Sequence, residues 1–350
     1  MALVLALPSD SRAPLQSLAP VRAMGAGLVM VAALFCLPGA TRAADLTLGL
    51  PIDCKATRAC LVQNYVDLGA GGRAQDYRCG AETYQGHNGV DIRLADMTEQ
   101  RRGVNVLAAV PGTVLRLRDG SADVSFKAEG APPAVGAECG NGVIIAHRDG
   151  WETQYCHMAR GSLKVKVGQQ VARGAVLGKV GLSGMTEFPH LHLSVRRHGK
   201  VVDPFAPDLA PGRCSPIAGT DLWDDAARQA LGYRTGAVLN TGFSSTVVSM
   251  EDVESGRTPA PGAASPILVA YVRAIHLKAG DVQRLTVAAP NGEILASKVL
   301  TALDRDQAQT LSLLGLRRPR AGWTSGSHRG EFQVLRKGQV VVSASFTVRL

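Results

Sequence analysis

Apolar residues recur in short stretches along residues 104–196, and no helical period is sustained there. The stretches are separated by Gly, Asp-Gly and Pro-Gly turns, which is typical of antiparallel β-strands. The Asp149-Gly150 pair between two of the stretches indicates a tight hairpin. We expect strands at residues 104–110, 113–117, 142–146, 152–156, 175–180 and 192–196.

The pattern changes beyond Cys214. An amphipathic helix is predicted over residues 222–231 as a connector. Residues 251–266 are rich in Gly, Pro, Ala and Ser and are expected to form a long loop. Several strands joined by regular turns suggest an immunoglobulin-like β-sandwich. The strand-like pieces lie around residue 238 and at residues 267–275, 282–287, 294–299, 331–335 and 340–350, with hairpin turns at 290–292 and 336–339.

The N-terminal residues have the features of a secretory signal peptide. Arg22 precedes an apolar run over residues 24–37, and small residues at 41–43 resemble a cleavage site. The run is short for a membrane span, which disfavours a retained membrane anchor. We expect no stable membrane insertion after the signal peptide is removed. We therefore divide the chain into a signal peptide (1–43), a first β domain (44–214), a helical connector (215–235) and a C-terminal β-sandwich (236–350).

Cysteine usage agrees with export. Six of the seven cysteines follow the leader, an even number that favours disulfides in an exported protein. Cys139 and Cys156 flank the predicted hairpin and are expected to pair, and Cys54 with Cys60 would close a small loop. Six cysteines allow fifteen pairings, so the connectivity stays open. A zinc-thiolate site is disfavoured because no Cys-x-x-Cys occurs.

Net charge narrows the range of partners. The chain carries a formal charge of +9, and without residues 1–43 it has 35 basic and 28 acidic groups, leaving +7. A positive surface favours polyanions, which in a cell envelope are wall polymers and lipid headgroups. Aromatic residues make up only 5% of the chain and no basic run interleaves with them, so we expect no nucleic-acid partner. The sequence leaves the oligomeric state open.

Four histidines and one aspartate are the candidate functional residues. His190 and His192 alternate along an extended segment and therefore point to the same side. His87 and Asp91 are separated by a turn that contains Gly89, which can fold both groups towards one cation. Two imidazoles and a carboxylate leave the fourth zinc position open for water, the property of a catalytic site. A free imidazole such as His157 suits acid/base work.

These motifs resemble peptidase family M23, the lysostaphin-like or LytM-type zinc endopeptidases. The family pattern is His-x-x-x-Asp, then Tyr-x-His, then His-Leu-His, and all three stand here in that order at residues 87–91, 155–157 and 190–192. Further similar phrases lie at 106–114, 167–171 and 181–184. One departure is Glu187-Phe188-Pro189, where members often carry Thr-Gly-Pro, and it bears on substrate preference.

The resemblance implies an antiparallel two-sheet peptidase domain with an open groove, covering roughly residues 64–204. It implies His87, Asp91 and His192 as zinc ligands, with His157 and His190 as unliganded catalytic histidines. We assign His190 as general base because its strand neighbour is a ligand, and His157 as oxyanion stabiliser; the two roles can be exchanged. His147 and His198 are expected to face solvent, and with His276 and His328 they are left out of the site.

The implied activity is zinc-dependent hydrolysis of peptide cross-links in peptidoglycan, in the periplasm or outside the cell. The alternative is a non-catalytic LytM-type envelope factor that activates another wall hydrolase, although that class typically lacks a zinc ligand. A weaker interpretation, a lipoyl- or biotinyl-carrier turn at residues 167–174, is disfavoured because Lys164, Lys166 and Lys179 lie in no obvious hairpin tip. The bond that is cut cannot be identified from the sequence.

Overall fold

The computed structural model describes residues 46–128, 130–131, 135–217 and 219–350. The predicted signal peptide lies outside these residues. The described residues form one compact unit. Among the described helices, none has the length and apolar character needed to cross a bilayer.

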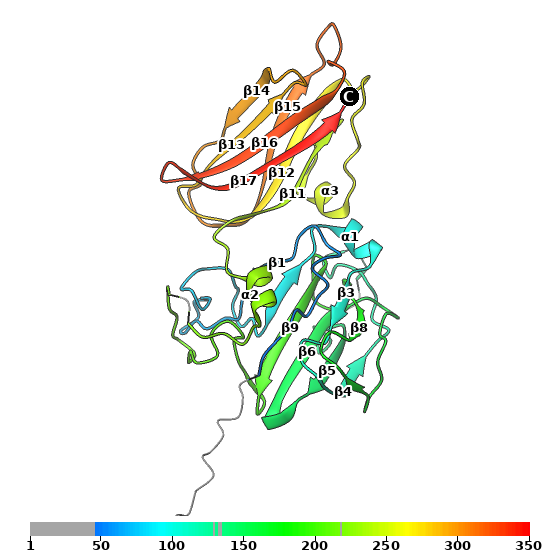
Figure 1. The fold of residues 1–350 in the computed structure, drawn as a ribbon, viewed down its shortest axis with the longest axis vertical. Helices are drawn as coiled ribbons and strands as arrows, with labels where there is room; N and C mark the ends of the chain where they lie inside the picture. Colours follow the sequence, from blue (N-terminus) through cyan, green and yellow to red (C-terminus); the bar gives the residue numbers. More distant parts are fainter. Residues whose placement is uncertain (1–45, 129, 132–134, 218) are drawn as a thin grey trace, which may run out of the picture. The chain divides into compact units, whose positions relative to one another are not determined.

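An antiparallel sheet of eight strands organises the first part of the chain (Figure 1). Its strand order is β1-β2-β9-β6-β5-β4-β7, with β10 paired to β9. Strands β3 and β8 form a separate two-stranded sheet. The bounds are β1 Leu61–Asn64, β2 Val90–Arg93, β3 Asn105–Leu107, β4 Gly112–Arg118, β5 Asn141–Ala146, β6 Trp151–Met158, β7 Gln170–Val171, β8 Val176–Lys179, β9 His190–Arg197 and β10 Lys200–Val201.

The predicted hairpin is confirmed. Strands β5 and β6 are joined by a short turn, η1, at Arg148–Gly150. Asp149 has φ of 56° and Gly150 has φ of 71°, the left-handed backbone that tight hairpin turns require. Strands are present in each of the six predicted stretches, although β6 runs on to Met158 and therefore includes His157.

Three disulfides tie the first part of the chain together. Both expected pairs form, Cys54–Cys60 and Cys139–Cys156. Cys79 joins Cys214 across 135 positions. The first two pairs close local loops, so the spacing of their cysteines indicates which ones pair. The third pair is brought together only by the tertiary fold.

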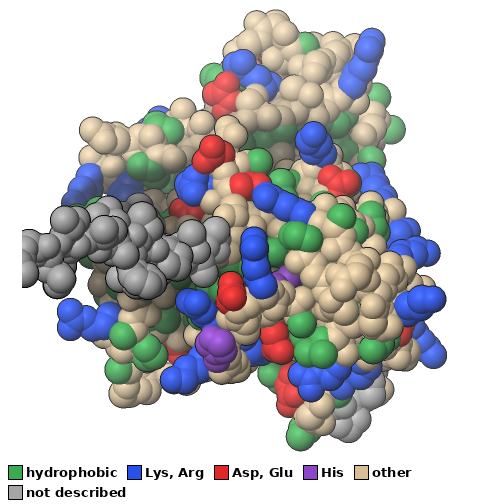
Figure 2. Space-filling view, turned by 60° about the horizontal axis from the view of Figure 1, so that its bottom comes forward, with side chains coloured by type: hydrophobic (Ala, Val, Ile, Leu, Met, Phe, Trp, Pro, Cys, Tyr) green, Lys and Arg blue, Asp and Glu red, His purple; other side chains and the backbone are tan. Residues whose placement is uncertain are grey.

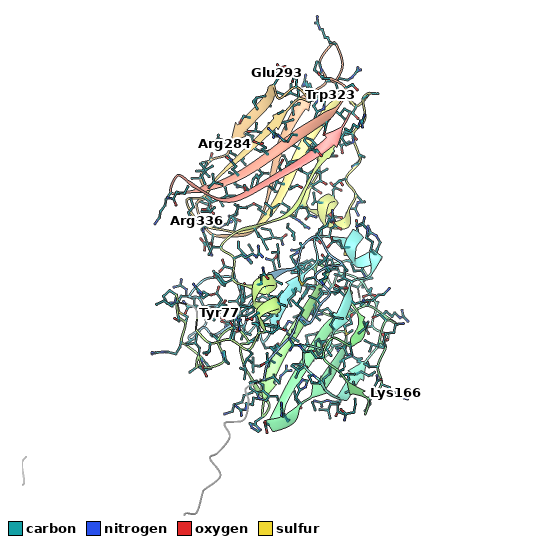
Figure 3. All side chains as sticks on the ribbon, in the orientation of Figure 1. Tyr77, Lys166, Arg284, Glu293, Trp323 and Arg336 are labelled. Carbon is teal, nitrogen blue, oxygen red and sulfur yellow. A yellow bond between two sulfur atoms is a disulfide. The ribbon has the colours of Figure 1, made fainter. Side chains whose placement is uncertain are left out.

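Two further sheets form the C-terminal β region, which we define as residues 237–349. The orders are β11-β12-β15 and β14-β13-β16-β17. Buried side chains from both sheets, including Val272 and Phe332, share one apolar core, and side chains fill the region (Figure 3). The bounds are β11 Ala237–Ser244, β12 Ile267–Leu277, β13 Val282–Ala288, β14 Ile294–Val299, β15 Gln307–Arg317, β16 Ser327–Arg336 and β17 Gln339–Arg349.

The structure corrects some of the expected elements. Residues 251–266 are not wholly a loop, because helix α3 spans Met250–Ser255. The Ser249 side chain and Asp252 form a reciprocal capping box at its start, which stabilises so short a helix. A second short helix, α1 at Met97–Arg102, was also not predicted. The connector helix is confirmed as α2, Asp225–Leu231, and strand β15 was missed.

Candidate metal centre

Two neighbouring strands and one loop bring the predicted ligands together. Asp91 on β2 lies directly opposite His192 on β9 in the strand register. His190 precedes His192 by two positions on the same strand. His87 lies in the loop just before β2, and its imidazole reaches the same place. The pleat and register of the sheet therefore produce the predicted convergence.

The donor atoms of these residues are close enough to share one ion. The Oδ1 atom of Asp91 lies 2.8 Å from His192 Nδ1 and 3.1 Å from His87 Nε2. The two nitrogens lie 3.1 Å apart. Zinc with bonds of 2.0–2.2 Å in a tetrahedron needs neighbouring donors about 3.4 Å apart. Exposed fractions of 1%, 3% and 12% for the side chains of His87, Asp91 and His192 show a sheltered site. This donor set fits zinc.

Hydrogen bonds from outside the cluster fix how His87 and Asp91 present their donor atoms. The Nδ1–H of His87 donates to the backbone oxygen of Tyr65 over 2.7 Å, which leaves Nε2 as the inward-facing atom. Asn64 Nδ2 donates to Asp91 Oδ2 over 2.8 Å, which leaves Oδ1 facing the two imidazoles. Such partners orient ligands and tune metal affinity.

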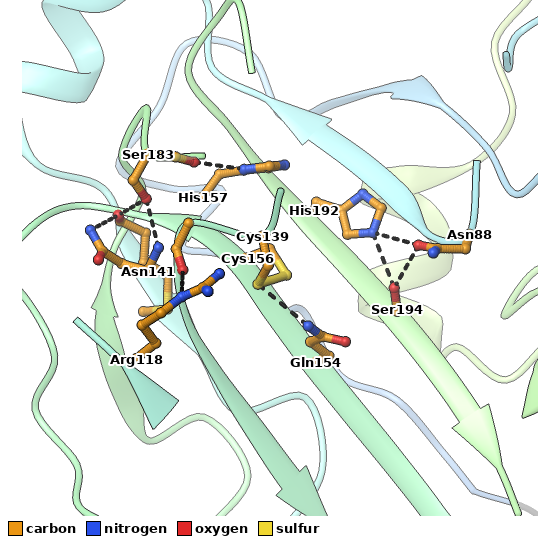
Figure 4. Close-up of a disulfide and its surroundings, with 12 residues drawn as sticks. Asn88, Arg118, Cys139, Asn141, Gln154, Cys156, His157, Ser183, His192 and Ser194 are labelled. Carbon is orange, nitrogen blue, oxygen red and sulfur yellow. Dashed lines mark hydrogen bonds between the residues drawn. A yellow bond between two sulfur atoms is a disulfide. The ribbon is translucent and has the colours of Figure 1, made fainter. Parts of the chain in front are cut away.

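His192 is oriented in the same way. Its Nε2 lies 3.0 Å from Ser194 Oγ and 3.2 Å from Asn88 Oδ1 (Figure 4), so Nδ1 faces the cluster. A Cβ on Gly89 would lie 2.5 Å from His192 Nε2, so glycine is needed for the loop before β2 to approach the His192 ring this closely. Sequence reasoning did not identify Asn64, Asn88 or Ser194, although alternation along β9 places Ser194 on the same face as His192.

A bulge in β6 turns His157 towards the cluster. The β5–β6 register shifts between Asn141 and Val143, and His157 has φ of 60°. Bulges redirect side chains in this way. The Nδ1–H of His157 donates to the Ser183 backbone oxygen over 2.8 Å (Figure 4), which leaves Nε2 free of that bond. Its backbone N–H donates to the carbonyl of Cys139, whose sulfur is bonded to Cys156.

His190 lies beside His157. The centroids of the two rings are 4.6 Å apart. The Nδ1 atom of His190 lies 2.9 Å from the backbone oxygen of Phe188 and 3.0 Å from Thr186 Oγ1, so its proton is held on that side. The Nε2 atom lies 3.4 Å from Asp91 Oδ1. The structure therefore places all five predicted residues in one cluster.

Electrostatics favour an ionised carboxylate among the imidazoles. Burial opposes ionisation of Asp91, but the neighbouring His190 and His87 outweigh burial and hold its pKa well below the usual range. Burial likewise lowers the pKa of His87, yet Asp91 raises it further, so the net shift is upward. Burial, followed by the charges of His190 and His192, holds the pKa of His157 well below the usual value.

A cleft of about 380 Å³ opens onto the cluster. Its floor comes from β6 and β9, and its sides come from the loops around residues 84–88, 138–139 and 185. The lining residues include Tyr84, Gln85, Gly86, His87, Asn88, Glu138, Cys139, Gln154, Cys156, His157, Met185, His192, Ser194 and Arg196. His190 is not among them. Basic and acidic side chains are interspersed over the face in Figure 2 rather than gathered in one basic patch.

The remaining histidines lie elsewhere. His147 was expected to face solvent, but it is partly buried and bonded to Pro111 and Thr153. His198 is exposed, as expected. His276 and His328 are buried in the C-terminal β region.

Residues 85–204 match the family model described as peptidase family M23. The chain is 36% identical over 111 residues to the "Cell division protein DipM" of Caulobacter vibrioides, covering 31% of this chain and 17% of that protein. It is 30% identical over 135 residues to an "Uncharacterized metalloprotease" of Haemophilus influenzae, covering 39% and 23%. Over 64 residues it is 38% identical to the "Peptidoglycan DD-endopeptidase ShyA" of Vibrio cholerae, covering 18% and 14%. The chain therefore spans less than a quarter of the length of each relative.

Solved structures show weaker likeness. A zinc-containing peptidase from Vibrio cholerae has 24% identity and a TM-score of 0.27, over 42% of this chain and 39% of that chain. The catalytic domain of lysostaphin from Staphylococcus simulans has 24% identity and a TM-score of 0.24, over 34% and 75%. The family match and the ordered motifs within it identify the domain: residues 85–204 of this chain form a domain of peptidase family M23.

Proposed function

We propose that the protein is a zinc-dependent endopeptidase that hydrolyses peptide cross-links of peptidoglycan. The observation that carries this proposal is the buried cluster of His87, Asp91 and His192, whose donor atoms all lie within 4.8 Å of one another. Each of these three side chains also makes a hydrogen bond through the polar atom that faces away from the cluster. The name of one relative, a peptidoglycan DD-endopeptidase, supports the substrate class.

Under this proposal His87, Asp91 and His192 hold the metal. A zinc ion bound there would activate a water at neutral pH and polarise the scissile carbonyl. His190 accepts the proton of the attacking water at Nε2, because its Nδ1–H is committed to the Phe188 carbonyl. It then returns the proton to the leaving amine. His157 stabilises the negative oxygen that develops on the carbonyl, and the two roles can be exchanged.

The cleft suits an extended peptide. Gln154 and Arg196 lie together on its floor, with Arg196 Nη1 donating to Gln154 Oε1 over 2.6 Å. Tyr84 and Met185 stand half-exposed at its sides. Polar groups on the floor can bind peptide carbonyls and carboxylates, while the apolar side chains cover the peptide's aliphatic parts.

The wider assignments belong to the same proposal. Residues 1–43 direct export, residues 44–214 form the peptidase domain, residues 215–235 are the connector, and residues 236–350 are an immunoglobulin-like accessory domain. Three disulfides support an oxidising location such as the periplasm or the exterior.

The alternative is a non-catalytic envelope factor that binds and activates another wall hydrolase. The name of one relative, a cell division protein, is compatible with that role. The full donor set favours the enzyme, because factors of that class typically lack one or more zinc ligands.

Two variants test the proposal. His87→Ala should lose zinc and turnover together, because a ligand is removed. His157→Ala should keep zinc, because His157 is not one of the proposed ligands. It should lose turnover on isolated wall sacculi, because the group that stabilises the negative oxygen is gone. Zinc content by mass spectrometry and released peptides by chromatography are the readouts. Full activity in the His157 variant would refute its assigned role, and activity in zinc-free protein would refute the metal mechanism.

A further inference from the structure

Arg93 is a fully buried cation close to the candidate metal centre. It follows Asp91 by two positions on β2 and lies opposite His190 in the β2–β9 register. None of its side chain is exposed. Burial lowers its pKa to about 10, which still leaves the guanidinium charged at neutral pH. A buried charge of this kind needs a partner of opposite sign.

That partner comes from a distant part of the chain. Arg93 Nη2 donates to Glu254 Oε2 on helix α3 over 2.6 Å, across 161 positions. The same oxygen accepts from Nη1 of Arg273 on β12 over 2.5 Å, and Arg273 is also fully buried. Within the described residues Glu254 is the one carboxylate in ion-pair contact with either arginine. Glu254 therefore compensates two buried charges at once.

Arg93 in turn supports the segment that orients His190. Its guanidinium carbon lies 4.2 Å from the centroid of the Phe188 ring, a cation–π arrangement. The Phe188 ring lies 4.8 Å from the ring of His190. The backbone oxygen of Phe188 accepts the Nδ1–H of His190 over 2.9 Å. The second acceptor near this nitrogen, Thr186 Oγ1, itself donates to the Phe188 oxygen over 2.8 Å. A shift of Phe188 would therefore disturb both acceptors that fix which nitrogen of His190 faces Asp91.

We propose that Glu254 is a positioning residue for His190, acting through Arg93 and Phe188. The inference rests on the proposed function, in which His190 moves the proton. It also gives the residues after the peptidase domain a definite part in the reaction. Removing the carboxylate would leave Arg93 buried without its counter-ion, so the guanidinium would turn away from Phe188 to find another acceptor or water. The carbonyl that holds His190 would then lose its support.

Further contacts favour coupling through this region rather than a single chance ion pair. Asn240 Nδ2 donates to Asp96 Oδ2 over 3.1 Å, and its Oδ1 accepts from Arg273 Nε over 2.8 Å. His276 Nε2 lies 2.9 Å from the backbone oxygen of Gln63, whose side chain accepts from Arg93 Nη1 over 3.0 Å. Arg93 therefore belongs to a hydrogen-bonded network built by both parts of the chain.

The test uses full-length protein carrying Glu254→Gln, which keeps the shape of the side chain and removes its charge. Glu251→Gln on the same helix is the control, because Glu251 is exposed and pairs only with exposed Arg257 in the described residues. For Glu254→Gln we expect kcat to fall about 10- to 100-fold, the range for loss of an outer partner that orients a side chain in a metal site. KM and zinc content should stay near wild type, and Glu254→Asp should restore part of kcat.

A readout without turnover separates this inference from the proposed function. In zinc-free protein labelled with ¹⁵N-histidine, the Nδ1–H of His190 should give a protected NMR signal in wild type and in Glu251→Gln. That signal should broaden or vanish in Glu254→Gln while the protein stays folded. One combination of results would separate the two claims: the signal is present in wild type and lost in Glu254→Gln, but wild-type protein with zinc cleaves no sacculi. In that case the proposed function fails and the positioning role stands.

Other outcomes would overturn the positioning role. One is a Glu254→Gln protein with a lower unfolding midpoint but an unchanged His190 signal and unchanged kcat below that midpoint, which indicates a structural role alone. The other comes from combining Glu254→Gln with Phe188→Leu: effects on kcat that simply add would show that Glu254 does not act through Phe188. We expect the double variant to lose little more than the worse single variant.

Discussion

Asn64 offers a sharp test of how the metal centre is held, because its side chain is hydrogen-bonded to a candidate ligand and is not itself one of the candidate ligands. Its Nδ2 donates to Asp91 Oδ2 over 2.8 Å, and this bond leaves Oδ1 aimed at His87 and His192. A hydrogen bond to a charged group contributes about 1.5–3 kcal/mol. Since about 1.4 kcal/mol corresponds to a tenfold change in affinity, Asn64→Ala should weaken zinc binding about 10- to 100-fold.

The assay is competition for zinc between the protein and a chelator of known affinity, at fixed pH. Asn105→Ala is the matched control, because Asn105 lies on β3 and its side-chain amide makes no hydrogen bond within the described residues. Control and wild type should bind alike. An Asn64→Ala protein that is folded and binds zinc within about twofold of wild type would refute the reasoning, because the ligand geometry would then not depend on this bond.

Three further predictions concern the surroundings of the site. Replacing Cys139 and Cys156 by serine opens a link across 17 positions and should lower the free energy of unfolding by about 3 kcal/mol in urea titrations; a loss below about 1 kcal/mol would contradict this. Burial lowers the pKa of His276 in the folded protein, whereas its pKa in the unfolded chain is about 6.5. Below that pH the unfolded chain binds more protons than the folded protein, so the free energy of unfolding should fall with falling pH. His276→Gln should flatten that pH dependence of the urea midpoint, and an unchanged slope would exclude His276 as its source. Arg196→Gln should raise KM on sacculi with zinc content unchanged, because Arg196 lies on the cleft floor; an unchanged KM would exclude a substrate contact.

Much of the site could be predicted because its residues stand in short local motifs. The alternation of a strand places His190 and His192 on one face, and a glycine turn lets His87 and Asp91 converge. The hairpin followed from Asp149-Gly150, whose backbone conformations suit a tight turn. In each case the information lies within a few neighbouring positions.

The unpredicted features depend on the tertiary fold or carry weak local signals. The Cys79–Cys214 disulfide spans 135 positions. In the sequence, Arg93 cannot be distinguished from an ordinary surface arginine. Its burial as a cation depends on Glu254, a residue distant in the chain that compensates its charge. Helix α3 is too short to show a helical period, and only its capping box at Ser249 marks it. Strand β15 is mostly half-buried, so its apolar alternation is faint.

The most direct test of the central claim is digestion of isolated wall sacculi by the purified protein, followed by mass spectrometry of the released fragments. The proposed mechanism predicts cleaved peptide cross-links with native protein, none after chelation, and recovery when zinc is added back. Asp91→Ala should stay inactive after the same addition. Cleavage that persists in chelated protein or in Asp91→Ala would contradict a zinc peptidase built on His87, Asp91 and His192.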